Sequence, residues 1–480
     1  MLSLRDIFFA FIWIALLILA GRIIKNKVGW IQRLYLPESI VAGALALLLG
    51  PQVLGLIVTA IAGEGALLSE GLFSEPIREA WSSAPGIFIN IVFAALFLGE
   101  VIPSPKQIWR RAAPQVIFGQ SLAWGQYVVG ILVTLLILIP LFNANPISGA
   151  LIEIGFEGGH GTAGGMTSTF ADLGFEEGAD LALGLATVGI VTGIITGTLL
   201  ADWARKKQHV SVAQDQDTDA VEDTVPEMSH EDNERVRERR AHLTRGLLID
   251  PLSLNFGFVG IAVIFGWLIQ QGLILIESLT WGNTGFTVME YIPLFPMALI
   301  GGILVQLIMV RLDIDALVIP RLTKNIAGTA LDVVVVTALA SISLQVIGGN
   351  LGIFLILSVA GITWNIVFFL WFAPRLFPDY WFEKAIGDLG QSMGVTATGI
   401  LLMRMVDPEN RSGAFESFAY KQLFFEPIVG GGLFTAASPA LISSLGLITT
   451  LLITAGLLVF WIGAGFVLMR QEARSAVAKQ

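Results

Sequence analysis

Groups that could bind an ion or a small anion lie in a part of the chain that is unusually rich in glycine. The run Gly155–Gly165 is more than half glycine, and the polar residues in or beside it are Glu153, Glu157, His160 and Thr162. Carboxylate, hydroxyl and carbonyl oxygens are ligands of hard cations, whereas free backbone N–H groups bind anions. Glycine costs about 1 kcal/mol per position in a helix interior, so the run predicts a broken helix that exposes such backbone groups.

A second glycine-rich stretch, Gly387–Gly399, repeats this combination later in the chain. It holds Asp388 and Thr398, and its Thr396-Ala397 pair matches Thr162-Ala163 of the first stretch. Close packing of helices through small residues would explain the glycines, but it would not explain the acidic and histidine side chains among them. Paired broken helices bind substrates and ions in many secondary transporters.

The composition places both stretches in a membrane protein. Of the 480 residues, 55% are hydrophobic and 14% are charged, whereas soluble domains carry about 25% charged residues. The chain has no cysteine, which excludes disulfides and thiolate metal sites. Arg5 precedes an apolar run, but no small-residue cleavage site follows that run, so we interpret it as a retained first helix and not as a signal peptide.

Apolar windows predict about eleven spans, five before and six after a charged segment. The expected spans are 7–24, 37–62, 85–102, 114–142, 179–201, 252–276, 293–310, 326–347, 351–372, 412–436 and 441–469. The glycine-rich stretches are short for a span, and we interpret them as re-entrant hairpins at about 146–170 and 386–403. Residues 204–245 carry many charges with little apolar pattern, which predicts a solvated linker that ends in a charged helix.

The positions of Lys and Arg determine the expected orientation. With the amino terminus outside, all of the 28 Lys and Arg except Arg5, Arg78 and Lys421 fall in cytoplasmic loops. Cytoplasmic loops of membrane proteins are enriched in these residues. We therefore expect the amino terminus outside, and the linker and the carboxyl terminus in the cytoplasm.

The expected fold class is an all-α polytopic membrane protein with two inverted-topology repeats of five transmembrane helices. Each repeat carries one re-entrant hairpin, and an extra C-terminal span follows. The expected parts are a first repeat at 1–203, the linker at 204–245, a second repeat at 246–437, an additional helix at 438–469 and a tail at 470–480. Asn90 in the third span falls opposite Asp332 in its counterpart. Inverted repeats place the binding site at their interface, near the bilayer midplane.

Three motifs resemble the bacterial sodium/glutamate symporter family. They are Gly158-Gly159-His160-Gly161-Thr162, Tyr35-Leu36-Pro37-Glu38 followed by Val41-Ala42-Gly43, and Gly394-Val395-Thr396-Ala397-Thr398. The similarity covers most of residues 1–444. It implies sodium-coupled uptake of L-glutamate, two inverted halves with hairpins, a homodimer and a place in the bacterial inner membrane. Two positions depart from the family pattern: Ala397 stands where proline is usual, and Glu157 where a small polar residue is usual.

These patterns together suggest residues for the substrate and for the coupling ion. The expected substrate-binding residues are groups of the two hairpins and one cation within a span: Glu157, Gly159, His160, Gly161, Thr162, Gly394, Thr396 and Lys421. The expected sodium ligands are amide, hydroxyl and carboxylate groups: Asn90, Asp332, Asp388, Thr396 and Thr398. Ionisable residues within spans are costly and are by default functional. The expected partners are L-glutamate or a related small anion, sodium as the coupling ion and the lipid bilayer; no nucleic acid and no further cofactor is expected.

The sequence leaves alternatives open for several of these residues. Lys421 could pair with the neighbouring acids Glu416 and Glu426 and make no contact with substrate. Asp388 could pair with a nearby Lys or Arg, the threonines could bond their own helices, and His160 could be neutral and hydrogen-bonded. The substrate could be another small organic anion or amino acid.

Two other classes of protein fit the sequence less well. A carboxylate-bridged metalloenzyme would need a second Glu-xx-His motif, and the only histidine outside the linker is His160. We therefore expect no enzymatic activity. A passive channel is not excluded by composition, but paired broken helices on inverted halves favour alternating access.

Overall fold

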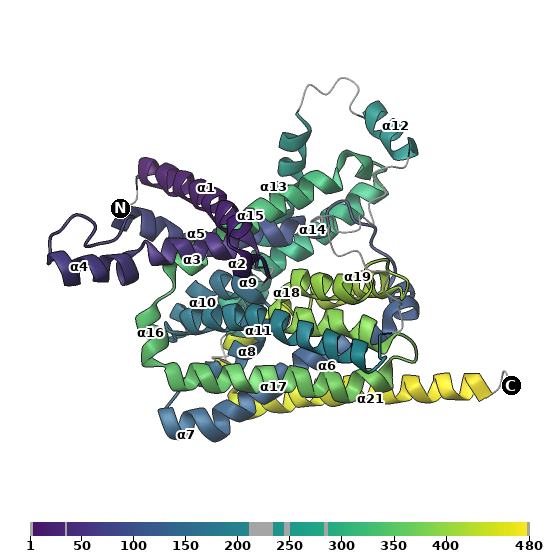
Figure 1. Ribbon diagram of the computed structural model, residues 1–480. Helices are drawn as coiled ribbons and strands as arrows, with labels where there is room; N and C mark the ends of the chain where they lie inside the picture. The colour runs from purple at the N-terminus through teal and green to yellow at the C-terminus, as the bar shows by residue number, and fades with distance from the viewer. Residues whose placement is uncertain (1–2, 34–35, 211–233, 244–249, 283–286, 478–480) are drawn as a thin grey trace. The chain divides into compact units, whose positions relative to one another are not determined.

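The computed structural model describes residues 3–33, 36–210, 234–243, 250–282 and 287–477 (Figure 1). Within these ranges the chain is all helical and contains no strand. Most of the predicted linker, residues 211–233 and 244–249, lies outside the described residues. The described part of its end forms helix α12 (Glu234–Leu243), where a charged helix was predicted.

The helices before the linker follow most of the predicted spans. They are α1 (Leu4–Lys27), α2 (Gly29–Arg33), α3 (Glu38–Leu48), α4 (Leu56–Ala62), α5 (Glu75–Ala95), α6 (Pro105–Val133), α7 (Ile139–Phe142), α8 (Leu151–Phe156), α9 (Gly159–Gly165), α10 (Thr167–Asp172) and α11 (Gly178–Lys206). The predicted third span, 85–102, is shifted, because α5 keeps Pro85 in its interior. This helix begins at Glu75-Pro76, since proline in the first turn suits a helix start.

The helices after the linker include a second departure from the predicted spans. They are α13 (Pro251–Leu279), α14 (Leu294–Arg311), α15 (Pro320–Ser341), α16 (Leu344–Gly349), α17 (Leu351–Leu376), α18 (Trp381–Val406), α19 (Ala414–Phe425), α20 (Leu433–Leu445) and α21 (Leu447–Val477). The predicted span 412–436 is not continuous, because the helix ends at Phe425 and resumes at Leu433. Pro427 and left-handed glycines, with φ of +70° at Gly430, occupy the interval.

The helices confirm the class of an all-α polytopic membrane protein. In the part of the chain that the structure describes, nine helices are long and apolar enough to cross a membrane. Two shorter apolar helices are Pro146–Phe156 and Leu433–Leu445. The inverted relation of the two halves and the boundaries of the repeats stay predictions.

The chain divides into two compact units, each built from both predicted halves. Unit 1 consists of Met1–Glu100, His160–Gly184 and Arg237–Phe354. It contains the first three long helical segments of each half: α5 packs against α14 and α15, α13 packs against α14, and α1 packs against α3. Its buried core includes Trp81, whose indole N–H donates to the carbonyl of Ala10 at 3.1 Å.

Unit 2 consists of Val101–Gly159, Leu185–Val236 and Leu355–Gln480. Helix α6 is its central element, since α6 packs against α8, α18, α19 and α21. Unit 2 therefore combines long helices such as α6 and α21 with the short helices α8 and α20 and the broken helix α18.

Helix α18 is a helical hairpin whose two arms meet at Gly394 and Val395. Val395 has a φ of +64°, which is a rare conformation for a β-branched residue. The arms pack in close contact: a Cβ atom at Gly390 would lie 2.7 Å from Cα of Gly399, and one at Gly399 would collide with the carbonyl oxygen of Gly387. Glycine on both arms therefore permits the hairpin. That it is re-entrant in the membrane stays a prediction.

We expect Gly399→Val to separate the two arms of α18 and to lower stability by about 1–3 kcal/mol or more, because the added side chain has no space. The measurement is the melting temperature of the purified protein in detergent. Gly260→Ala on α13 is the control, since nothing lies within 4 Å of a Cβ atom at that position. A Gly399→Val protein that melts with the wild type would show that the arms can separate freely.

Candidate functional site

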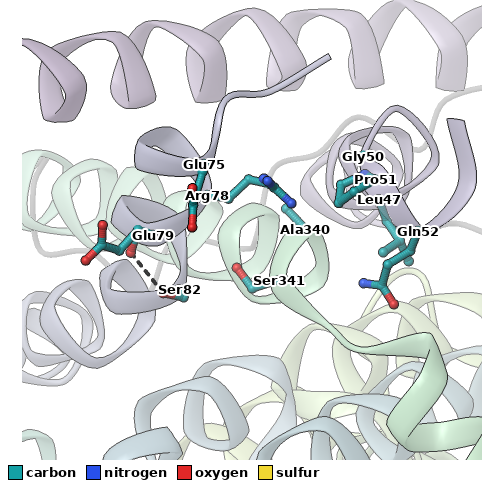
Figure 2. Close-up of a pocket in the computed structure, with 10 residues that line it drawn as sticks. All are labelled: Leu47, Gly50, Pro51, Gln52, Glu75, Arg78, Glu79, Ser82, Ala340 and Ser341. Atoms are coloured by element: carbon teal, nitrogen blue, oxygen red, sulfur yellow. Dashed lines mark hydrogen bonds between the residues drawn. The ribbon is translucent and has the colours of Figure 1, made fainter. Parts of the chain in front are cut away.

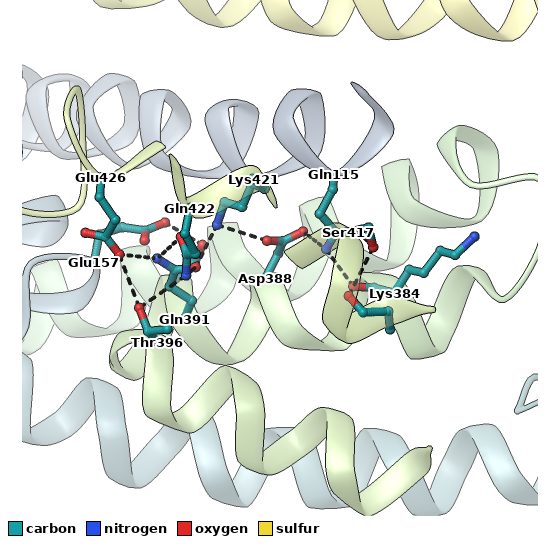
Figure 3. Close-up of polar contacts among 12 residues, drawn as sticks. Gln115, Glu157, Lys384, Asp388, Gln391, Thr396, Ser417, Lys421, Gln422 and Glu426 are labelled. Atoms are coloured by element: carbon teal, nitrogen blue, oxygen red, sulfur yellow. Dashed lines mark hydrogen bonds and ion pairs between the residues drawn. The ribbon is translucent and has the colours of Figure 1, made fainter. Parts of the chain in front are cut away.

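Buried polar side chains of α6, α18 and α19 form a network near the break in α18 (Figure 3). An ion pair lies within it: Nζ of Lys421 is 3.0 Å from Oδ1 of Asp388, and both side chains are almost fully buried. Gln115 of α6 donates from Nε2 to Oδ2 of Asp388 at 2.6 Å. Gly119 leaves room for the lysine, because a Cβ atom there would lie 2.5 Å from Cε of Lys421.

The geometry identifies the partner of Lys421 among the alternatives that the sequence left open. Its ion-pair partner is Asp388, whereas Glu416 forms an exposed pair with Arg111 at 3.2 Å. Breaking a buried ion pair costs about 3–5 kcal/mol, because an uncompensated charge remains. The charge of Asp388 is thus already offset by a fixed cation.

A second part of the network lies where the two arms of α18 meet. Lys421 donates to Oε1 of Gln391 at 2.6 Å, and Gln422 donates to the same oxygen at 2.9 Å and to Oγ1 of Thr396 at 3.2 Å. Thr396 in turn donates to Oε1 of Glu426 at 3.2 Å. Carboxylate, hydroxyl and amide oxygens are therefore gathered at one point. Hard cations prefer such ligands.

Glu426 is held in place by the broken segment between α19 and α20. A fully buried carboxylate of α8, Glu153, accepts hydrogen bonds from the backbone N–H of Gly430 at 2.9 Å and from the hydroxyl of Thr435 at 2.7 Å. Its other oxygen accepts from the Tyr127 hydroxyl at 2.5 Å. The negative charge of Glu153 is thus satisfied by hydrogen bonds, and it anchors the segment that carries Glu426.

Glu157 is a further buried carboxylate of unit 2, at the end of α8. It is 3% exposed, and its Oε1 accepts a hydrogen bond from Oγ of Ser392 at 2.5 Å. The next residues break the helix, with a φ of +65° at Gly159. A Cβ atom at Gly159 would collide with Val395, so the break after α8 contacts the break in α18.

The expected site residues divide between the two units. Unit 2 contains Glu157, Gly159, Asp388, Gly394, Thr396, Thr398 and Lys421, and unit 1 contains Asn90, His160, Gly161, Thr162 and Asp332. In unit 2, Asp388, Thr396 and Lys421 share the network described above, whereas Thr398 donates to the carbonyl of Gly394 in its own hairpin.

In unit 1 the described contacts of the expected residues are local. Asn90 donates to the carbonyls of Gly86 and Ile87, one turn earlier on its own helix. Asp332 is half-buried on α15. His160 is buried on α9.

Four residues of the network were not among the expected site residues: Gln115, Gln391, Gln422 and Glu426. Glu426 was considered only as a partner of Lys421. The signal that would have identified it is the sequence from Glu426 to Gly432, in which a proline and three glycines follow an acid within an apolar region. This segment marks a third broken helix. The three glutamines have no such signal, because only the fold brings them together.

Unit 1 contains a cavity of about 350 Å³, and Arg78 of α5 extends into it (Figure 2). Its lining consists of residues from α3, the following turn, α5 and α15: Leu47, Gly50, Pro51, Gln52, Glu75, Arg78, Glu79, Ser82, Ala340 and Ser341. None of the expected site residues lines this cavity. The polar network of unit 2 is therefore the stronger candidate for the binding site.

Comparison with known proteins identifies the family of this chain. The family model described as sodium/glutamate symporter matches residues 110–410, which is more than half of the chain. A search of curated proteins found no match. The matched region includes both glycine-rich stretches and the network residues of α6 and α18, Asp388 among them. The chain belongs to the sodium/glutamate symporter family, and sodium-coupled symport of glutamate is the function that this membership implies.

Proposed function

We propose that the protein imports L-glutamate with sodium by alternating access, and that both ligands bind at the break in α18. The observation that carries this proposal is the cluster of amide, hydroxyl and carboxylate groups of Gln391, Thr396, Gln422 and Glu426 at a broken helix, in a member of a sodium-coupled family. Broken helices are the usual ligand sites of secondary transporters.

Sodium fits best beside Glu426 and Thr396. The sequence suggested Asp388 as the sodium carboxylate, but that charge is offset by Lys421 at 3.0 Å. Glu426 forms no ion pair within the described chain, and its Oε1 accepts hydrogen bonds from Nε2 of Gln391 at 3.3 Å and from the hydroxyl of Thr396 at 3.2 Å. Within the described ranges no group of three or more acidic or histidine side chains could hold a metal. A monovalent ion with one carboxylate and several neutral oxygens suits this arrangement.

The substrate carboxylate fits the amino-terminal end of the second arm, which begins at Thr396. Free N–H groups and the helix dipole favour an anion there. Glu426 opposes this, because its charge lies next to Thr396 and like charges repel strongly in a low-dielectric interior. A sodium ion on Glu426 removes the repulsion. This gives a physical reason for coupled binding of the two ligands.

Other parts of the proposal rest on the sequence and on the family resemblance. The unit 1 residues His160, Gly161, Thr162, Asn90 and Asp332 stay candidates for the same ligands. We further propose a homodimer in the bacterial inner membrane, with the amino terminus outside. Transport of another small organic anion or amino acid is the second candidate function, because Glu157 departs from the family pattern.

The function is tested by uptake of radiolabelled L-glutamate into proteoliposomes. We expect accumulation against the glutamate gradient when sodium is high outside, and none when choline replaces sodium. Equilibration without accumulation would indicate a passive channel. Competition by a panel of amino acids and dicarboxylates identifies the preferred substrate, and a substrate other than glutamate would favour the second candidate.

Glu426→Gln tests the sodium site in the same assay. We expect the sodium concentration for half-maximal uptake to rise about tenfold or more, which corresponds to about 1.4 kcal/mol. Glutamate affinity at saturating sodium should change less, because the two bindings are linked. Glu416→Gln on α19 is the matched control, since this carboxylate is exposed and paired with Arg111. An unchanged sodium dependence in Glu426→Gln would show that sodium binds at another site.

Asp388 and Lys421 are tested by a double-mutant cycle on stability. We expect Asp388→Asn and Lys421→Met each to destabilise the protein by about 3–5 kcal/mol, because each leaves one buried charge unpaired. The double variant should lose much less than the sum of the two. Melting temperatures of the four purified proteins give the answer. Additive losses, with a raised sodium requirement in Asp388→Asn alone, would make Asp388 a sodium ligand and not a member of an ion pair.

The topology is tested with single cysteines, because the natural chain has none. Lys207 and Glu176 are both exposed and are expected on opposite sides of the membrane. A membrane-impermeant maleimide added to intact cells should label Glu176→Cys and leave Lys207→Cys unlabelled until the cells are opened. The reverse pattern would invert the orientation.

A further inference from the structure

Glu157, a buried carboxylate of unit 2, has one oxygen without a hydrogen-bond partner among the described residues. Glu157 is 3% exposed, and Ser392 donates to its Oε1. Its Oε2 has no hydrogen-bond partner, and Glu157 forms no ion pair, among the residues that the structure describes. A buried carboxylate is costly unless hydrogen bonds or an opposite charge compensate it. The free oxygen therefore points to a ligand that carries a positive charge.

The neighbouring acid on α8 shows what a structural carboxylate looks like in this unit. Glu153, one turn earlier, accepts three hydrogen bonds, which come from Tyr127, Gly430 and Thr435. These three hydrogen bonds compensate the Glu153 carboxylate without any ligand. Glu157 has one donor at one oxygen, so the same helix presents one satisfied carboxylate and one that is available.

Glu157 adjoins the place where the proposed substrate site lies. Its partner Ser392 is on the first arm of α18, shortly before the break, and Gly159 contacts Val395 at the break itself. Val395 is held in a left-handed conformation that is strained for its type, and such strain often occurs at ligand sites.

We infer that Glu157 binds the primary ammonium group of an amino-acid substrate and makes the site selective for amino acids over dicarboxylic acids. This inference rests on the proposed function. Among the described residues, Ser392 is the one hydrogen-bond donor to Glu157. An ammonium group supplies three N–H donors and one charge. A site that leaves a buried polar group unpaired rejects ligands that lack the matching donor by large factors.

The wild-type protein provides the first test, because glutarate is glutamate without its ammonium group. We expect glutarate to inhibit sodium-driven L-glutamate uptake at least about 100-fold more weakly than unlabelled L-glutamate does. Equal inhibition by the two would overturn the inference while leaving glutamate symport intact. Absence of any sodium-driven glutamate uptake would instead contradict the proposed function, and the inference with it.

Glu157→Gln provides the second test in the same proteoliposomes. The half-saturating glutamate concentration should rise about 10- to 100-fold, as expected for loss of a hydrogen bond to a charged group. Inhibition by glutarate should strengthen relative to glutamate, and the sodium half-saturation measured at saturating glutamate should stay at its wild-type value. Glu416→Gln, whose carboxylate is exposed, should keep both the wild-type selectivity and the wild-type affinity.

Two outcomes of this variant would contradict the inference. A raised sodium requirement with unchanged selectivity between glutamate and glutarate would make Glu157 a sodium ligand. Wild-type kinetics in all respects would give it no role in binding. If Glu157→Gln does not fold, Ser392→Ala answers the same question, because it removes the hydroxyl that orients Glu157. This variant should lower the preference for glutamate in the same direction, and an unchanged preference would count against the inference.

Discussion

The interior of unit 2 contains more carboxylates than fixed cations, and the arrangement of its site follows from that imbalance. Lys421 is the only basic side chain that is fully buried among the described residues of this unit, whereas five acids are buried there: Glu153, Glu157, Glu383, Asp388 and Asp407. Burying an ion without a partner is costly, and within a membrane it is rarely tolerated without function. Each carboxylate therefore needs its own form of compensation, and the contacts show which form each one has.

The compensation differs from one acid to the next. Asp388 has Lys421 and the amide of Gln115, and Glu153 has three hydrogen-bond donors. Groups of the protein itself therefore compensate the charges of both of these acids. Glu426 has the hydroxyl of Thr396, and Glu157 has the hydroxyl of Ser392. Neither forms an ion pair among the described residues, and Lys421 acts on both only at longer range. We therefore expect mobile ligands with positive charge to complete their compensation.

Broken helices allow this arrangement in an otherwise apolar protein. Breaks follow α8 at Gly159, divide α18 at Gly394 and Val395, and separate α19 from α20 between Glu426 and Leu433. Irregular backbone is tolerated at membrane depth only where protein or a cavity satisfies its polar groups. Here Glu153 satisfies part of the third break through the N–H of Gly430.

Much of this fold was predictable from sequence, because apolar length and glycine content act locally. The long helices and the broken character of Gly155–Gly165 and Gly387–Gly399 follow from that local chemistry. The third break was missed, although Pro427 and its glycines mark it, because apolar neighbours on both sides gave the window the hydropathy of a span. The start of α5 was missed because Pro85 was interpreted as a boundary.

The contacts of the site were less predictable than its helices. The sequence identified Asp388 and Lys421 as costly charges within spans but did not pair them, because α18 and α19 are brought together only by packing on α6. The same holds for Gln391 and Gln422, whose roles depend on where the two arms of α18 meet. Long-range placement of this kind has no local signal in the sequence.

We propose that a cation must offset the charge of Glu426 before the substrate carboxylate can bind. The most direct test is equilibrium binding of L-glutamate to the purified wild-type protein across a range of sodium concentrations, at constant ionic strength with choline. We predict that sodium lowers the glutamate Kd, and that glutamate lowers the sodium Kd by the same factor, as linkage requires. A glutamate Kd that is the same with and without sodium would contradict this coupling between sodium and glutamate binding.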